Sequence, residues 1–386
     1  MSNIREIATF ISDGDWIESN DQSNYGIRLV QTGNIGNGEY LDKPDKAKYI
    51  SEETCSRLNC TDVYEGDILI SRLPDPIGRS CIVPQDIGRA ITAVDCTILR
   101  VNHNIYNPQF FVYYTQTDLY KSRLSHYLTG TTRKRISRKN LENIVVPQYP
   151  KKEQDIIVNK LDMITNLISL RKQQLKNFDM LVKSRFIEMF GDLINEPKYP
   201  GIKLGSLGVM ITGGTPSRKH DEYYGGNIPF ISTPCLGSNF ISEKNVQNYL
   251  TEAGVKNSAT HKIPPYSLMV GNRVGVGKSS INTCEMCTNQ DILSFVDIDT
   301  SRFDLLFLKK VIDQYSPYFD EHKRGATIQG VPSKVIKDSM VPDVPLEIQK
   351  RYTALVKQSD KSKMAVQKSL DELETLKKSL MQTYFG

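Results

Sequence analysis

Two long stretches of the chain carry apolar residues at alternating spacings of four and three. The first follows Pro150 and runs for forty residues without glycine or proline, and the second follows Pro345. An average period of 3.5 residues places these positions along one side of a helix, where they pack against a partner helix. We therefore predict two long helices, at 150–191 and 345–386, that pack against each other. The predicted packing positions are Ile157, Leu161, Ile164, Ile168, Leu175, Phe178 and Val182 in the first helix and Val356, Val366, Leu370, Leu373 and Leu380 in the second.

The remaining segments, 1–149 and 192–344, contain short apolar stretches separated by glycine, proline and asparagine. This pattern is typical of short strands joined by turns. Residues 108–124 and 302–319 each predict one helix. We therefore expect two globular domains of the α/β or α+β class, each followed by one of the long helices.

The two halves of the chain are similar to each other. Residues 130–191 align with residues 325–386 at an offset of 195, and thirteen of these 62 ungapped positions are identical. Residues 4–40 align with the second half at an offset of about 200. Such self-similarity predicts a tandem duplication. The long helices could instead bury their apolar faces against their own domains, but 38 helical residues span about 57 Å, which favours a spacer.

Composition narrows the class of protein. The chain has 386 residues, a formal net charge of +5 and no apolar run long enough to span a bilayer. Its first residues lack the pattern of a signal peptide, so we expect a cytoplasmic protein without a membrane span. Cys284 and Cys287 form a CxxC pair, but no second ligand pair accompanies it. We therefore expect two ordinary strand cysteines and no metal site.

Two fragments imitate catalytic motifs. Residues 271–280, GNRVGVGKSS, resemble a phosphate-binding P-loop, but Asn272 stands where its first glycine belongs and no apolar helical pattern follows. Residues 107–110, NPQF, resemble the base-holding turn of adenine methyltransferases, yet no glycine-rich cofactor turn accompanies them. Pro108 is better explained as the first residue of a helix. We predict no catalytic residues in this chain.

The duplicated order of segments resembles the specificity (S) subunits of Type I DNA restriction–modification systems. The resemblance is carried by residues 146–154, VPQYPKKEQ, with the helix after them, and by residues 213–217, GGTPS, followed by 224–232, YGGNIPFIS. The domain–helix–domain–helix order covers essentially the whole chain. The second copy departs from this pattern at 345–349, PLEIQ, and its apolar seam is more polar.

The resemblance implies target-recognition domains at 1–149 and 192–344, each reading one half of a split, asymmetric DNA target. Two antiparallel coiled-coil helices would separate the domains and set the distance between the half-sites. It also implies double-stranded DNA and two methyltransferase (M) subunits as partners, with two restriction (R) subunits in systems that have them. S-adenosylmethionine, ATP and Mg²⁺ would be bound by those partners, and this chain would bind no cofactor.

Basic and polar residues in loops at matching places of the two copies are the candidate DNA contacts. Arginine and lysine side chains bind phosphates, and arginine, asparagine and glutamine bind base edges. The candidates are Arg72, Arg79, Arg133, Lys134 and Arg135 in the first domain and Arg273, Lys278, Lys323, Arg324 and Gln329 in the second. Two alternatives stay open: the recognition subunit of another multi-subunit methyltransferase or restriction system, and a protein–protein scaffold built on the coiled coil.

Overall fold

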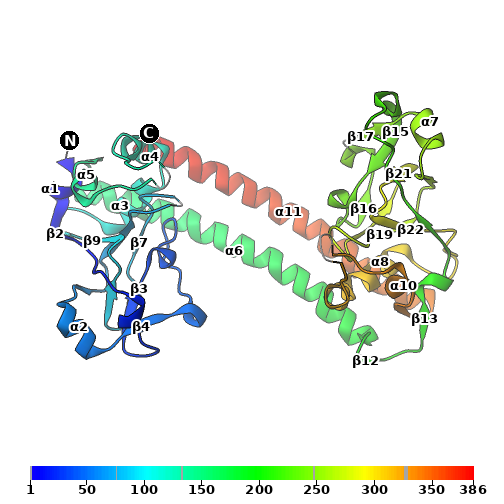
Figure 1. Cartoon of the computed structure of the whole chain (residues 1–386), viewed down its shortest axis with the longest axis horizontal. Helices are drawn as coiled ribbons and strands as arrows, with labels where there is room; N and C mark the ends of the chain where they lie inside the picture. The colour runs from blue at the N-terminus through cyan, green and yellow to red at the C-terminus, as the bar shows by residue number, and fades with distance from the viewer. Residues whose placement is uncertain (1, 75, 132–133, 247, 326–328) are drawn as a thin grey trace. The chain divides into compact units, whose positions relative to one another are not determined.

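The chain forms two compact units, each containing one globular domain and one end of each long helix. The computed structural model describes residues 2–74, 76–131, 134–246, 248–325 and 329–386. Unit 1 comprises residues 1–172 and 368–386, and unit 2 comprises residues 173–367 (Figure 1).

The first domain contains ten short strands and five short helices in its described residues. In chain order they are β1 (Ser2–Asn3), α1 (Ile4–Ile7), β2 (Ala8–Asp13), β3 (Ile27–Val30), β4 (Lys48–Ile50), α2 (Glu52–Leu58), β5 (Asp62–Val63), β6 (Ile68–Ser71), β7 (Ser80–Ile82), β8 (Ala90–Thr92), β9 (Cys96–Val101), α3 (Pro108–Thr115), α4 (Asp118–Ser125), α5 (Arg138–Glu142) and β10 (Val145–Val146), and the long helix α6 (Lys151–Phe190) follows.

The second domain repeats this order with additional short strands. Its elements are β11 (Gly191–Asp192), β12 (Glu196–Pro197), β13 (Gly201–Lys203), the 3₁₀ helix η4 (Leu204–Ser206), β14 (Val209–Thr212), β15 (Tyr224–Ile231), β16 (Phe240–Ile241), β17 (Asn248–Leu250), α7 (Glu252–Lys256), β18 (Lys262–Ile263), β19 (Leu268–Gly271), β20 (Ser279–Asn282), β21 (Met286–Thr288), β22 (Ile292–Val296), α8 (Leu305–Gln314), α9 (Ser316–Glu321), α10 (Ser333–Lys337), β23 (Met340–Pro342) and the long helix α11 (Leu346–Phe385).

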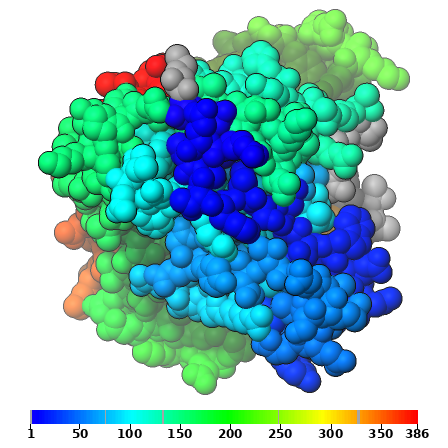
Figure 2. All heavy atoms as spheres, turned by 90° about the vertical axis from the view of Figure 1, so that its left-hand side faces the viewer, coloured from blue at the N-terminus to red at the C-terminus, as the bar shows by residue number. Residues whose placement is uncertain are grey.

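The sheets of the two domains have the same topology. The orders β2-β9-β6-β7 and β4-β3-β8-β5 in the first domain correspond to β14-β22-β19-β20-β16 and β17-β15-β21-β18 in the second. The register also agrees, because Ser2 pairs with Val146 in the first domain and Ile202 pairs with Val341 in the second. The agreement in strand order and register confirms the predicted duplication of a mixed domain. Figure 2, which faces unit 1, shows the N-terminal segment in dark blue on the surface.

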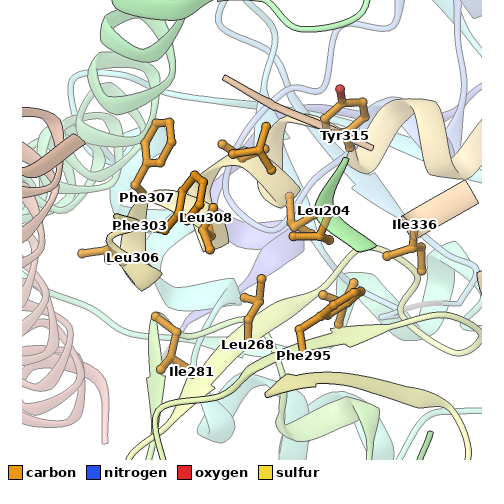
Figure 3. Close-up of a cluster of buried hydrophobic side chains, with 14 of the residues drawn as sticks. Leu204, Leu268, Ile281, Phe295, Phe303, Leu306, Phe307, Leu308, Tyr315 and Ile336 are labelled. Atoms are coloured by element: carbon orange, nitrogen blue, oxygen red, sulfur yellow. The ribbon is translucent and has the colours of Figure 1, made fainter. Parts of the chain in front are cut away.

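One helix of each domain covers a sheet and fills its core. In the second domain Phe307 of α8 belongs to the same apolar cluster as Leu268 and Phe295, which lie on neighbouring strands (Figure 3). All three side chains are fully buried. The core is therefore a helix packed on an antiparallel sheet.

Two of the predicted helices are each broken into a pair. Residues 108–124 form α3 and α4, and residues 302–319 contain α8 and α9. The break in the first domain follows from Thr117, whose hydroxyl accepts a hydrogen bond from the backbone of Tyr120 and caps α4. In the second domain Pro317 lies in the first turn of α9. The prediction of one continuous helix was wrong because the cap at Thr117 in the first domain and Pro317 in the second each begin a new helix.

The long helices form as the apolar pattern predicts, over 40 residues each. Gly191 ends α6 with a φ of +83°, and a Cβ atom there would lie 2.3 Å from the carbonyl oxygen of Glu196. The helices run antiparallel within unit 1, since Lys172 of α6 pairs with Glu374 of α11 at 2.8 Å while the start of α6 joins the same apolar cluster as Phe385. In unit 2 the ion pair between Asp179 and Lys363 joins the other ends.

The predicted packing positions have two environments. Seven are buried: Ile157, Leu161, Ile164, Ile168, Val182, Val356 and Leu370. Five are half-buried: Leu175, Phe178, Val366, Leu373 and Leu380. The buried positions near the helix ends, including Ile157, Leu161 and Val356, belong to the cores of the globular domains. The ends of the apolar seam therefore pack into the cores of the globular domains.

Each globular domain receives the end of the long helix that belongs to the other copy. Phe385, at the end of α11, packs on Phe110 of unit 1 with ring centroids 4.9 Å apart. Phe190, at the end of α6, packs on Phe307 of unit 2 at 5.0 Å. These contacts occupy the same place in both units, so each domain is completed by the other half of the duplication.

A buried glutamine joins each long helix to the domain that precedes it. The side-chain oxygen of Gln154 accepts a hydrogen bond of 2.8 Å from the backbone of Asn107, the cap residue of α3, and its amide donates to two carbonyls. Gln349 accepts from the backbone of Asp304, the cap residue of α8, at 2.9 Å and also donates to two carbonyls. The two residues are 1% and 0% exposed. We call these contacts the glutamine anchors.

Replacement of a glutamine anchor is expected to destabilise its unit. Gln154→Ala or Gln349→Ala removes the side-chain partner of three backbone groups, and the free energy of unfolding should fall by about 1–3 kcal/mol. Urea denaturation of the full chain measures the change. Gln173→Ala, on an exposed turn of α6, is the matched control and should leave stability within about 0.5 kcal/mol. Equal stability of the anchor variants and this control would contradict the role of the anchors.

Candidate nucleic-acid interface

The candidate residues gather around one strand connection in each domain. The connection after β6 is closed by hydrogen bonds from Gly78 to Ser71 (2.8 Å), and the connection after β19 by the bond from Gly277 to Gly271 (2.9 Å). Gly78 and Gly277 have φ values of +81° and +77°, where glycine is favoured. A strand follows in both cases, so residues 271–280 offer no helix N-terminus to a phosphate, as the sequence predicted.

A second segment lies beside this connection in both domains. It begins and ends at an isolated antiparallel bridge, between Thr129 and Arg135 in unit 1 and between Arg324 and Gly330 in unit 2. The offset between the two bridges is 195, the same as that of the long helices. We call the two segments of each domain the paired loops: residues 71–80 with 129–136 in unit 1, and 271–279 with 324–331 in unit 2.

Backbone hydrogen bonds hold the paired loops together. Ile136 donates to the carbonyl of Arg72 at 3.4 Å, and Val331 donates to the carbonyl of Asn272 at 2.7 Å. Segments that are 64 residues apart in unit 1 and 59 residues apart in unit 2 thus meet at the same point of each unit. The structure brings together the two regions of each domain that the sequence analysis selected.

In each domain, the residue at the end of the first of the paired loops forms a hydrogen bond with the helix that covers the sheet. In unit 1 the hydroxyl of Ser80 lies 2.7 Å from that of Thr115 in α3. In unit 2 Ser279 donates to Asp313 of α8 at 3.2 Å, and Lys309 pairs with the same carboxylate at 2.8 Å. Burial lowers the pKa of Lys309, and the neighbouring carboxylate of Asp313 opposes that shift. The loop ends are therefore fixed on rigid elements.

Two predicted DNA contacts in unit 1 turn inward. Arg79 is only 9% exposed, and its guanidinium donates hydrogen bonds to four backbone carbonyls, those of Thr32, Ile35, Leu73 and Pro76. The side chain of Arg72 is 15% exposed, donates to a carbonyl and lies 3.4 Å from Asp13. Their interpretation as DNA contacts is corrected accordingly, because these guanidinium groups are used to hold the loop itself.

Backbone hydrogen bonds show which residues of the two loops correspond. Arg72 donates its backbone N–H to the carbonyl of Asp95, as Asn272 does to the carbonyl of Asp291. Arg72 is therefore the structural equivalent of Asn272. The loop of the first domain is one residue longer, which shifts the register by one.

Most of the other candidates are exposed. Lys134 and Arg135 in unit 1, and Arg273, Lys278, Arg324 and Gln329 in unit 2, have exposed side chains. Lys323 is half-buried and pairs with Asp320. Arg133 lies outside the described residues. The paired loops of both units thus present cations, and those of unit 2 also present a carboxamide.

The sequence analysis missed the acidic partners of these cations. Arg273 is 52% exposed and lies 3.6 Å from the carboxylate of Asp291, which is 15% exposed. Asp291 in turn accepts a hydrogen bond of 3.2 Å from the side chain of Asn289. The repeat contained a signal for this site, because Asp95 stands at the equivalent place in the first copy, after a strand that ends beside the loop.

The CxxC pair and the NPQF fragment are parts of the framework. Cys287 is buried in β21, where burial raises the pKa of its thiol to about 11, and Cys284 is half-buried before that strand. Within the described residues, no three histidine, cysteine or acidic side chains lie close enough to hold a metal ion. Pro108 is the first residue of α3 and Asn107 its cap, as predicted.

Comparison with known proteins identifies related chains. A family model described as Type I restriction modification DNA specificity domain matches residues 1–177 and again residues 199–375. A specificity subunit of the Type I restriction enzyme MjaIX from Methanocaldococcus jannaschii is 23% identical over 184 residues, which cover 47% of this chain and 43% of that protein. The HindI specificity subunit of Haemophilus influenzae is 29% identical over 124 residues, 32% of this chain and 27% of that protein. The aligned segments therefore span less than half the length of these relatives.

Two solved structures share the fold. A chain from a structure on complex assembly and conformational transition of the type I R-M system has a TM-score of 0.62 and 18% identity, and covers 99% of this chain and 96% of its own. The S subunit of a Type-I restriction-modification system from M. genitalium has a TM-score of 0.58 and 12% identity, with coverages of 100% and 95%. In the part of this chain that the structure describes, no helix is long and apolar enough to cross a membrane.

The inward orientation of Arg79 makes a prediction about stability. Arg79→Ala removes the donors of four carbonyls, and the free energy of unfolding should fall by about 2–4 kcal/mol. Arg135→Ala, an exposed residue of the neighbouring loop, is the control and should change stability by less than about 0.5 kcal/mol. Thermal denaturation of both variants tests this. If the melting temperature of Arg79→Ala equals that of the wild-type chain, the structural role assigned to Arg79 is wrong.

Proposed function

The chain belongs to the family of Type I restriction modification DNA specificity domains, and on that premise we propose that it is the DNA sequence-recognition subunit of a Type I restriction–modification complex. Each globular domain binds one half of a split DNA target through its paired loops. The observation that carries this proposal is the occurrence of the same loop framework, with exposed cations, in both copies of the duplication.

Differences between the two sets of paired loops favour an asymmetric target. Unit 1 presents Lys134 and Arg135 beside the inward-facing Arg72, whereas unit 2 presents Arg273 and Lys278. Cations bind phosphates in any sequence, while base edges are distinguished by specific donors and acceptors. Two domains with one framework and different side chains are suited to two different half-sites.

The long helices are proposed to set the distance between the half-sites. A helix of about 57 Å would span at most about 17 base pairs at 3.4 Å per pair. The glutamine anchors support this role because they join each helix rigidly to its domain. A flexible junction would allow many distances and would not define a gap.

Catalysis is assigned to partner subunits. We expect two methyltransferase subunits, which bind S-adenosylmethionine and methylate adenine, to dock on the helices, together with two restriction subunits that use ATP and Mg²⁺ in systems that have them. The complex would act on double-stranded DNA in the cytoplasm. In this proposal the present chain contributes recognition and spacing, and it binds none of these cofactors.

Removal of the exposed cations of unit 1 should weaken DNA binding without loss of stability. Lys134→Ala combined with Arg135→Ala should lower the slope of log affinity against log salt by about 0.9 for each phosphate that the variant no longer neutralises. The measurement is a salt titration of duplex binding by the full chain in complex with the co-expressed methyltransferase subunit. Lys160→Ala, an exposed cation on α6, serves as the control for a general charge effect. The same slope in the double variant and wild type would exclude these residues as contacts, and absence of salt-dependent binding by the wild type would favour a scaffold.

A matched lengthening of both helices should lengthen the gap between half-sites. One heptad inserted after Gln174 in α6 and one after Ser369 in α11 keeps the two helices in register and adds about 10 Å. The gap should grow by about three base pairs, or recognition should be lost. The methylated motif, read by sequencing of modified adenines, reports the gap. Retention of the original gap by an active complex would contradict the spacer role.

A further inference from the structure

The surroundings of Arg273 in unit 2 are chemically different from those of the other exposed cations. Its side chain leaves the end of β19 and passes beside the neighbouring loop so closely that a Cβ atom on Gly330 would lie 2.7 Å from the Cγ atom of Arg273. Gly330 is held there by the bridge to Arg324, and the next residue, Val331, donates to Asn272. The stem of Arg273 therefore lies directly beside the backbone of Gly330.

The guanidinium is held on one side by a carboxylate. Nη1 of Arg273 lies 3.6 Å from Asp291, whose other oxygen accepts a hydrogen bond from Asn289. No other partner of this guanidinium is found among the described residues. Nε and Nη2 remain as two parallel donors, whose planar fork matches a pair of adjacent acceptors.

The carboxylate beside Arg273 decides which kind of ligand fits this guanidinium. The negative charge of Asp291, 3.6 Å from Nη1 of Arg273, repels an anion. A phosphate would therefore be bound weakly here, whereas a base edge offers neutral acceptors for arginine.

These observations point to a base, and we propose that Arg273 reads a guanine in the half-site bound by unit 2, with Asp291 as the residue that positions it. Guanine presents O6 and N7 as two adjacent acceptors in the major groove, which match the arginine fork. This inference rests on the proposed function, since it requires that unit 2 binds a DNA half-site.

Unit 1 provides an internal comparison. The residue after Arg72, at the place of Arg273, is Leu73, and the place of Gly330 is taken by Arg135. Arg72 itself is directed toward Asp13 and a backbone carbonyl. The first domain therefore has no arginine fork at this position, and the guanine contact belongs to one half-site alone.

Selection from a randomised duplex library tests the assignment. The full chain, in complex with the co-expressed methyltransferase subunit, is compared with Arg273→Lys, Arg273→Ala and Asp291→Asn. Arg273→Lys keeps the charge and removes the fork. Both substitutions of Arg273 should therefore reduce the preference for guanine at one position of one half-site by about 5- to 150-fold and leave the other half-site unchanged.

The Asp291→Asn variant tests whether Asp291 positions Arg273 or only stabilises the fold. It keeps the shape of the side chain and removes the negative charge, so guanine preference should fall while affinity at low salt is unchanged or higher. A purely structural role of Asp291 would lower affinity for all sequences together with the melting temperature. Lys278→Ala, in the same loop, is the comparator for a phosphate contact and should weaken binding to all DNA sequences equally.

Four results would overturn the inference. Retention of the guanine preference by Arg273→Lys, or an equal loss for all sequences in Arg273→Ala, would identify a phosphate contact. An unchanged motif in both Arg273 variants would remove Arg273 from the interface while leaving the proposed function intact. If the wild-type complex selects no bipartite sequence, the proposed function fails, and the inference fails with it because Arg273 then has no half-site to read.

Discussion

A buried glutamine at the first turn of each long helix is the contact on which the arrangement of this chain depends. Gln154 and Gln349 satisfy the backbone at the cap of a domain helix and at the entry of the long helix at the same time. Buried backbone groups that lose their partners are costly, so the direction in which each helix leaves its domain is strongly determined. A recognition subunit that measures a distance along DNA needs this kind of junction.

The second constraint is the exchange of helix ends between the two copies. Phe385 completes the core that contains Phe110, and Phe190 completes the core that contains Phe307. Neither half of the duplication buries its core alone, because the last turn that covers each domain comes from the other copy. The duplication is thus a requirement of the fold, and loop side chains can vary on it without disturbing the core.

The large features of the fold could be predicted from the sequence because they depend on periodic patterns. The heptad seam, the repeat offset and the proline at the start of α3 each follow from local physical chemistry. The break before Asp118 could not be predicted, since one threonine cap outweighs an otherwise continuous apolar pattern. The orientation of Arg79 also could not be predicted. An arginine after a glycine bend has the same local sequence whether its guanidinium binds backbone carbonyls or faces solvent. Asp291 became visible only when the strand register placed it beside Arg273.

In the proposed function, two similar domains joined by two long helices read two different half-sites. Single-molecule sequencing of methylated adenines tests it directly, in cells that express the chain with its methyltransferase partner and in cells that lack only this chain. The account predicts one asymmetric motif of two half-sites at a fixed gap, present only when the chain is expressed. Methylation of a continuous motif, or the same motif without the chain, would contradict it.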